Sequence, residues 1–248
     1  MSIIETAIQW MEDTARNDIH GYDQKYRWGE HGDYDCSSAV ITAWSKAGVP
    51  VKTYGATYTG NMYTAFRNAG FADVTRNVNK STGAGLQRGD VLLNVRSHTA
   101  MYCGNNKEVE ASINERGRTT GGIPGDQTGK EFYIRPYRNY PWDYVLRFIE
   151  KTSEQIAKEV LAGKWGNGTV RKVMLEGSGY NYEEVQQMVN NIVKYGGVKT
   201  PEEVAREIIQ GKWKNGSERQ KRLLQAGYKQ EVIEQIQQMV NKLLGEYK

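Results

Sequence analysis

Cysteine is scarce in this chain of 248 residues, which contains only Cys36 and Cys103. Two cysteines cannot form a disulfide framework, so the composition is typical of a protein made in a reducing compartment. Cys103 lies in the apolar stretch 99–103, which predicts a buried strand. We therefore expect no Cys36–Cys103 bridge and a free thiol at Cys36.

Histidine is also rare, and long apolar runs are missing. The three histidines are too few, and the aspartates too scattered, to predict a closed metal site, so we expect metal-independent chemistry without a cofactor. No apolar stretch approaches the roughly 20 residues that span a bilayer. Residues 1–16 predict an amphipathic helix rather than a signal peptide, because acidic residues interrupt their apolar positions. We expect synthesis in the cytoplasm and no membrane insertion.

The formal net charge of +4 comes entirely from residues 151–248, because residues 1–150 hold 17 basic and 17 acidic side chains. A modest basic excess suits an anionic partner. The sequence has no basic cluster and no known nucleic-acid motif, so nucleic acid and anionic membranes are poor candidates. An anionic cell wall is the better match to this charge distribution.

The C-terminal part contains an internal repeat, because a shift of 48 positions aligns residues 152–180 with residues 200–228. Each copy predicts three short helices. Thr152 and Thr200 are expected to be N-caps, with Pro201 at the first helical position of the second copy. In the first copy the expected helices span residues 156–161, 169–175 and 183–193.

A tryptophan and an arginine recur six residues apart in both copies, as Trp165 and Arg171 and as Trp213 and Arg219. An arginine beside an aromatic ring and an asparagine side chain can hold a polar, partly anionic sugar. Core packing is an equally good interpretation of the tryptophans, because such small units need large apolar side chains.

The Gly-Lys-Trp, Asn-Gly, arginine and Gly-Tyr positions of both copies resemble the cell-wall-binding repeats of the Cpl-seven type, over nearly all of residues 152–244. The resemblance implies two three-helix bundles that bind the disaccharide-peptide unit of peptidoglycan. By position, it assigns the contacts to Trp165, Arg171, Trp213 and Arg219. Two weak sites on one chain would gain affinity on a polymeric wall through effective concentration.

Cys36 opens an apolar helical run that ends near Gly48 and Pro50, so its sulfur is expected in the first turn of a helix. The positive end of the helix dipole stabilises a thiolate there, which predicts a lowered thiol pKa. His98 follows the predicted strand 91–95 and opens the next strand. Cysteine and histidine in these places predict a nucleophile and its base, with a thiolate–imidazolium pair as the resting state.

Glu110 is the candidate for the third group, since it can lie beside His98 on the neighbouring strand and orient the imidazole. Glu108 and Asn114 are close competitors, because successive residues of a strand face opposite sides. His20 and His31 also compete with His98 for the role of base. In this scheme Cys36 attacks a carbonyl, and His98 carries its proton to the leaving amine.

Tyr26-Arg27-Trp28-Gly29, Tyr34-Asp35-Cys36-Ser37-Ser38, Gly89-Asp90 and Ser97-His98-Thr99 resemble the NlpC-type papain-like peptidases of bacterial cell walls. They resemble still more closely the bacteriophage branch labelled amidase family five. The resemblance runs from about residue 3 to residue 149. It implies that Tyr26 and Asp35 line the cleft and that Ser37 lies close to the bound peptide. Many relatives have histidine where this chain has Glu110.

These resemblances predict an α+β protein with a papain-like cysteine hydrolase domain, helices packed on an antiparallel sheet, over residues 1–149. Two wall-binding repeats are expected at 152–195 and 200–245. The implied function is that of a phage or prophage endolysin that acts on peptidoglycan after holin-type release. We favour a D-glutamyl or D-glutaminyl endopeptidase over an N-acetylmuramoyl-L-alanine amidase. An inactive wall-docking protein and a host autolysin are two further hypotheses.

Overall fold

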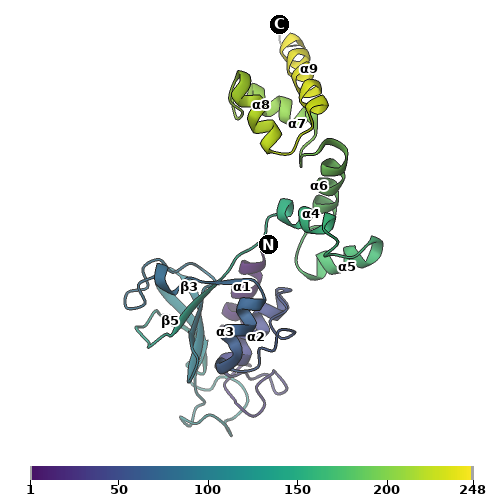
Figure 1. Ribbon diagram of the computed structural model, residues 1–248. Helices are drawn as coiled ribbons and strands as arrows, with labels where there is room; N and C mark the ends of the chain where they lie inside the picture. The colour runs from purple at the N-terminus through teal and green to yellow at the C-terminus, as the bar shows by residue number, and fades with distance from the viewer. Residues whose placement is uncertain (1, 247–248) are drawn as a thin grey trace. The chain divides into compact units, whose positions relative to one another are not determined.

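The computed structural model describes residues 2–246 and divides into two compact units, residues 1–150 and residues 151–248 (Figure 1). Among the described residues, the first unit contains three α-helices, a short 3-10 helix at Thr75–Asn77 and one six-stranded sheet, and the regular structure of the second is entirely helical. This arrangement confirms the predicted α+β class, with helices packed on an antiparallel sheet and followed by helical modules.

Every strand pair in the sheet is antiparallel, and the strand order is β1-β6-β2-β3-β4-β5. The central strands β2, β3 and β4 form the predicted meander. Strand β6, the last in the sequence, lies between β1 and β2. The strands are β1 (Phe71–Asp73), β2 (Val91–Asn94), β3 (His98–Gly104), β4 (Lys107–Ala111), β5 (Phe132–Pro136) and β6 (Tyr144–Phe148).

Three helices, α1 (Ile3–Ala15), α2 (Cys36–Lys46) and α3 (Thr59–Asn68), lie together on one side of the sheet (Figure 1). Helix α1 packs against α2 and against β3, β4 and β5, whereas α2 packs against β3 and β4. The helix is amphipathic, as the sequence predicts, and its buried apolar side chains are Ile3, Ala7, Ile8 and Met11. Packing of α2 on β3 brings the N-terminus of the helix toward the first residues of the strand.

An aromatic cluster fills the core between the helices and the β1–β6 side of the sheet. The Trp44 ring lies 4.7 Å from Phe71 and 5.4 Å from Phe148, and Phe66 lies 4.7 Å from Phe71. Trp44 and Phe66 are completely buried. Each buried aromatic side chain removes roughly 150–250 Å² of its surface from water, so this cluster stabilises the packing of α2 on the sheet.

The turn between β3 and β4 is built by Gly104, Asn105 and Asn106, all with positive φ. Asparagine and glycine tolerate this left-handed region better than other residues, which is why the sequence pattern predicts the turn. The β3–β4 register shifts between Tyr102 and Gly104, which accommodates one extra residue beside the turn. The strands on either side bring residues 98–102 and 107–111 next to each other.

Each half of the second unit contains three helices, and both first helices begin at the predicted threonines. The hydroxyls of Thr152 and Thr200 accept hydrogen bonds from the backbone N–H groups of Gln155 and Glu203, and Pro201 opens the second copy. The helices are α4 (Ser153–Leu161), α5 (Gly168–Gly177), α6 (Tyr182–Tyr195), α7 (Pro201–Ile209), α8 (Gly216–Gln225) and α9 (Gln230–Glu246).

Each half has its own apolar core, one around Ile156 and Leu175 and the other around Val204 and Leu223. Separate cores are what a tandem repeat of small modules requires, since each module must bury its own apolar faces. Within residues 2–246, no helix combines the length and apolar character needed to cross a membrane.

Candidate active site

Cys36 is the first residue of α2, and Asp35 is the N-cap of this helix. An Asp35 carboxylate oxygen accepts a hydrogen bond of 2.7 Å from the backbone N–H of Ser38, and the Ser38 hydroxyl accepts one of 2.9 Å from the backbone N–H of Asp35. This reciprocal capping box fixes the first turn of the helix. The sulfur therefore has a defined position at the N-terminus of α2, as predicted.

The predicted lowering of the Cys36 thiol pKa is wrong. Cys36 is only 5% exposed, and burial together with the Asp35 charge raises its pKa to about 12. Hydrogen bonds from the backbone N–H groups of Thr99 and Ser37 act in the opposite direction but are smaller. Desolvation of the thiolate therefore outweighs the helix N-terminus, and the resting Cys36 is a neutral thiol rather than the predicted thiolate–imidazolium pair.

His98 is buried at the start of β3, and its Nε2 atom lies 2.6 Å from Oε2 of Glu110 on β4. Met101 pairs with Val109, so the register puts His98 and Glu110 diagonally across the two strands on one face of the sheet. Their predicted proximity is present in the structure. The backbone N–H of Thr99, the second residue of β3, faces the Cys36 sulfur. His98, the first residue of β3, is therefore in the part of the strand that lies against the thiol.

Arg135 in β5 and Arg138, just after this strand, hold the Glu110 carboxylate from its other side. Arg138 Nη2 donates to Glu110 Oε2 at 2.6 Å, and Arg135 Nη1 donates to Oε1 at 3.3 Å. Although burial raises the pKa of Glu110, the His98 hydrogen bond and charge and the two arginines together lower it by more, so its pKa lies below the usual value. The carboxylate is ionised at neutral pH, so His98 Nε2 carries the proton of the shared bond and Nδ1 is left as acceptor in the neutral ring.

Glu108, the nearest competitor of Glu110, lies on the same face of β4 but accepts its hydrogen bond from the backbone N–H of Arg138, at 3.4 Å. Both carboxylates are completely buried. Burial and the neighbouring Glu110 charge raise the pKa of Glu108 to about 7. Glu108 therefore takes up a proton at a higher pH than Glu110, and Glu110 is the one that holds the imidazole.

Aromatic rings cover the rest of the His98 side chain. The Trp142 ring stacks on the imidazole at a centroid distance of 6.0 Å, and the Tyr140 ring lies 5.5 Å away at a steep angle. The Tyr140 hydroxyl is 2.9 Å from the Ser97 hydroxyl. These rings restrict the orientation of the imidazole. Tyr140 and Trp142 fall within the family resemblance, but the sequence pattern predicts no role for either of them.

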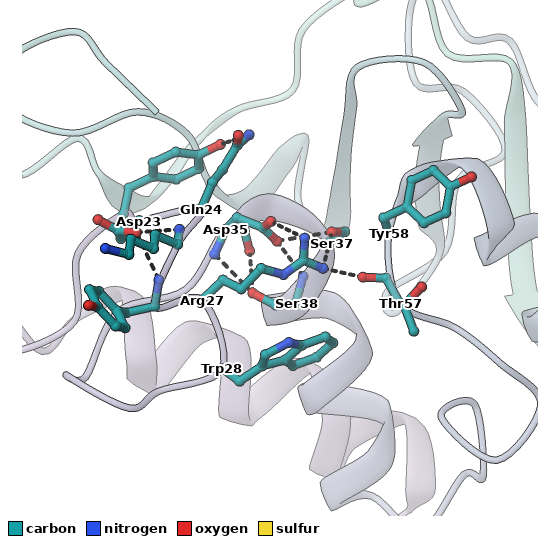
Figure 2. Close-up of polar contacts among 12 residues, drawn as sticks. Asp23, Gln24, Arg27, Trp28, Asp35, Ser37, Ser38, Thr57 and Tyr58 are labelled. Atoms are coloured by element: carbon teal, nitrogen blue, oxygen red, sulfur yellow. Dashed lines mark hydrogen bonds and ion pairs between the residues drawn. The ribbon is translucent and has the colours of Figure 1, made fainter. Parts of the chain in front are cut away.

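Asp35 and Ser37, the predicted substrate-binding residues on either side of Cys36, are bound to Arg27 (Figure 2). Arg27 Nη1 lies 2.8 Å from Asp35 Oδ2, and Arg27 Nη2 donates to the Ser37 hydroxyl at 3.2 Å. The Ser37 hydroxyl in turn donates to Asp35 Oδ1 at 2.9 Å. The Asp35 carboxylate thus has partners on both oxygens within the protein itself.

Tyr26, the other predicted cleft residue, is 42% exposed and packs its ring against His31 at 4.4 Å. A different tyrosine, Tyr22, lies near the thiol: burial and the proximity of the ionisable Cys36 raise the pKa of its hydroxyl, which also accepts a hydrogen bond from Gln24. Tyr22 was missed because the family motif begins at Tyr26. The parallel bridge between Tyr22 and Tyr34, just before the nucleophile, is the contact that brings it in.

His20 and His31, the competing histidines, have other contacts. His20 Nδ1 is 2.6 Å from the carbonyl oxygen of Gly32, and the His31 ring packs on Tyr26. Across the described residues, no group of three or more histidine, cysteine, aspartate or glutamate side chains is arranged to hold a metal ion.

In the first repeat, Arg171 forms three hydrogen bonds within its own module. Its Nε donates to the Gly166 carbonyl at 3.2 Å, and its two Nη atoms donate to Gln186 and Asn167 at 2.9 and 3.1 Å. Trp165 packs against the apolar core, and its Nε1 donates to Glu159. The tryptophan thus has the contact that the core-packing interpretation predicts, and the arginine organises the loop that precedes α5.

The second repeat reproduces this network. Arg219 donates to the Lys214 carbonyl, Gln237 and Asn215, and Trp213 donates to Glu207 and packs against its core. A pocket of about 240 Å³ opens beside Arg219. Trp213 is not among its lining residues, which are Ile208, Gly216, Arg219, Gln220, Leu223, Gln230, Ile233, Glu234, Ile236 and Gln237.

Comparisons with known proteins match both units. Residues 1–109 match a family described as an endolysin-like domain, and residues 154–193 and 202–244 each match the CW_7 repeat. Among solved structures, the crystal structure of the P60 domain from the M. avium subspecies paratuberculosis antigen MAP1204 is similar over 60% of this chain and 96% of that chain, with 19% identity and a TM-score of 0.37. No curated protein matches the chain significantly.

Proposed function

We propose that this chain, which joins an endolysin-like domain to two CW_7 repeats, is an endolysin that degrades peptidoglycan by cysteine-dependent hydrolysis of an amide bond in the stem peptide. The observation that carries the proposal is the buried pair of His98 and Glu110. His98 begins β3, the strand that lies against the N-terminus of α2, where Cys36 begins the helix. A thiol, an imidazole and a carboxylate in this order are the parts of a cysteine hydrolase.

In the proposed reaction Cys36 is a neutral thiol until it transfers its proton to His98. The imidazole has Nδ1 available as the acceptor, because Nε2 donates to the ionised Glu110. The thiolate then attacks the carbonyl carbon, and the imidazolium returns the proton to the leaving amine. Water hydrolyses the acyl-enzyme and regenerates the thiol. Glu110 stabilises the positive charge that His98 carries between these steps.

The peptide is proposed to bind along the surface around Tyr26, Asp35 and Ser37, and the glycan with its attached peptide to bind at the two repeats. The Asp35 carboxylate is already bonded to Arg27, Ser37 and Ser38. It can therefore contact the peptide only through an oxygen that also binds one of these partners. In the repeats, each guanidinium has five N–H donors, of which the module's own hydrogen bonds engage three. The remaining donors of Arg171 and Arg219 suit sugar hydroxyls and carboxylates.

The cleaved bond is tested by mass spectrometry of the soluble fragments released from purified Gram-positive peptidoglycan. We expect fragments that end at D-glutamate or D-glutamine and retain the disaccharide, as a D-glutamyl or D-glutaminyl endopeptidase produces. Release of intact stem peptides without sugar would instead identify an N-acetylmuramoyl-L-alanine amidase. A parallel incubation without the protein corrects for fragments already present in the wall.

Removal of residues 152–248 is expected to weaken binding to insoluble peptidoglycan by about 10²-fold, because two linked sites gain affinity through effective concentration. Co-sedimentation with purified wall measures this loss. Residues 1–150 form a compact unit with its own core, so circular dichroism serves to verify that the shortened chain is folded. Undiminished sedimentation of the folded, shortened chain would contradict the role assigned to the repeats.

A further inference from the structure

Arg27 connects three segments at the N-terminus of α2 (Figure 2). Its guanidinium forms the ion pair with Asp35, donates to the Ser37 hydroxyl, and also donates to the backbone carbonyl of Thr57, which precedes α3. Asp35 and Ser37 are the sequence neighbours of Cys36 on either side. One side chain therefore fixes both residues that flank the nucleophile.

The remaining faces of Arg27 are also enclosed. Its guanidinium lies over the Trp28 ring at 5.0 Å, and the ammonium of Lys52 lies 4.4 Å from the same ring. The Arg27 side chain is only 21% exposed, and its Nε atom is buried without a hydrogen-bond partner among the described residues. An arginine held by an ion pair, two further hydrogen bonds and an aromatic ring has little freedom to reorient.

The charges around Cys36 show what this arrangement does. The Asp35 carboxylate is 4% exposed and disfavours a negative charge on the sulfur, whereas Arg27 favours it. Tyr22 on the preceding segment is neutral, because burial raises its pKa. On β3, the titratable group in this direction is His98, with Glu110 behind it. Arg27 is thus the fixed positive charge on the α2 side of the thiol.

We propose that Arg27 is a positioning residue for the Cys36 nucleophile, which fixes the first turn of α2 and balances the Asp35 charge so that the sulfur can give up its proton. This inference rests on the proposed role of Cys36. The sequence pattern does not predict it, since Arg27 stands there only as a member of the Tyr26–Gly29 motif. An arginine ten residues before Ser37 is visible in the sequence, but the contact with Thr57 depends on tertiary structure.

The test measures alkylation of Cys36 in the full chain by iodoacetamide, followed by mass spectrometry of the Cys36 peptide between about pH 6 and 10. The thiolate is the reacting form, so among variants with equal access to the sulfur the rate follows the thiolate population without any substrate. Arg27→Gln is expected to slow alkylation at least about threefold, because it removes an opposite charge that favours the thiolate of Cys36. Arg27→Lys, which keeps the charge, is expected to retain most of the rate.

The decisive experiment removes the Asp35 charge, which opposes that of Arg27. Asp35→Asn keeps a good N-cap and leaves the Arg27 charge unbalanced, so Cys36 should react faster than in the wild type. The double variant Arg27→Gln/Asp35→Asn should return toward the wild-type rate. An Asp35→Asn rate that is unchanged or slower would overturn the proposal. So would an Arg27→Gln effect that persists undiminished in the double variant, because the loss would then be structural.

Arg88 and Cys103 provide the matched control. Arg88 is bound to Glu5 and Glu12 and donates to the Cys103 carbonyl at 2.7 Å. Its charge favours the thiolate of Cys103, as that of Arg27 favours the thiolate of Cys36. Arg88→Gln should change alkylation of Cys103 but not of Cys36.

Cys103 also reports folding, because unfolding exposes this buried thiol and accelerates its alkylation. If Arg27→Gln unfolds the chain, the alkylation rate of the Asp35→Asn variant tests the proposal instead. Absence of wall hydrolysis would contradict the proposed function without affecting these rates.

Discussion

Replacing Cys36 with alanine should reduce peptidoglycan hydrolysis by about 10⁴-fold or more, because the variant loses the group that forms the acyl-enzyme. The change removes one buried sulfur atom at the first position of α2, while the capping box of Asp35 and Ser38 does not involve the Cys36 side chain. The helix should therefore form normally. Turbidity loss of a wall suspension and fragment release by mass spectrometry measure the effect.

Co-sedimentation with wall is the control for this variant, since the repeats are unchanged and binding should equal that of the wild type. Cys103→Ala is the matched substitution, because Cys103 is also a buried free cysteine but lies near the far end of β3 from His98. It should keep hydrolysis within a few-fold of the wild type. Equal lysis by the Cys36→Ala chain would refute the cysteine mechanism, and no lysis by any form would favour an inactive wall-docking protein.

The features that could be predicted well from the sequence are those determined by local patterns. Helix α2 begins at Cys36 because Asp35 and Ser38 form a capping box within four residues. The proximity of His98 and Glu110 follows from a short turn between adjacent strands, whose register is set by the left-handed residues Gly104 to Asn106. In both cases the interacting groups are separated by a few residues or by one tight turn.

The features that were missed depend on contacts between distant segments. Arg138 reaches Glu110 because β5 pairs with β4 after a long loop, and no local pattern specifies that pairing. The thiol pKa was predicted in the wrong direction for the same reason. The helix N-terminus is visible in the sequence, whereas the burial of Cys36 arises only when α2 packs on β3. Desolvation then exceeds the effect of the dipole.

The repeats show how a family resemblance and packing lead to different accounts of one side chain. The resemblance assigns Trp165 and Trp213 to ligand contact by position, yet both pack against their cores and donate to a glutamate of the first helix of their repeat. A tryptophan that is partly buried in this way can shape a binding surface through the loop that it supports. The arginines, with equivalent hydrogen bonds in both copies, maintain the same loop geometry.

Replacing Glu110 with glutamine should lower kcat by about 10²-fold or more, with a much smaller change in KM. Glutamine preserves the shape of the side chain but removes the charge that stabilises the His98 imidazolium, and general acid–base catalysis contributes factors of about 10²–10⁴. The carboxylate has a lowered pKa, so its charge is present throughout the neutral range and is lost only in acid. Steady-state hydrolysis of a soluble muropeptide measures the two constants.

Glu108→Gln is the control for this prediction, because Glu108 is equally buried and lies on the same strand but is bonded to Arg138 rather than to His98. With a pKa of about 7, Glu108 is already largely protonated slightly below neutral pH, and glutamine resembles that neutral form. Its substitution should therefore change kcat by only a few-fold at about pH 6.5. Equal losses for both variants would mean that the buried charge cluster stabilises the fold, and that Glu110 has no separate effect on the imidazole.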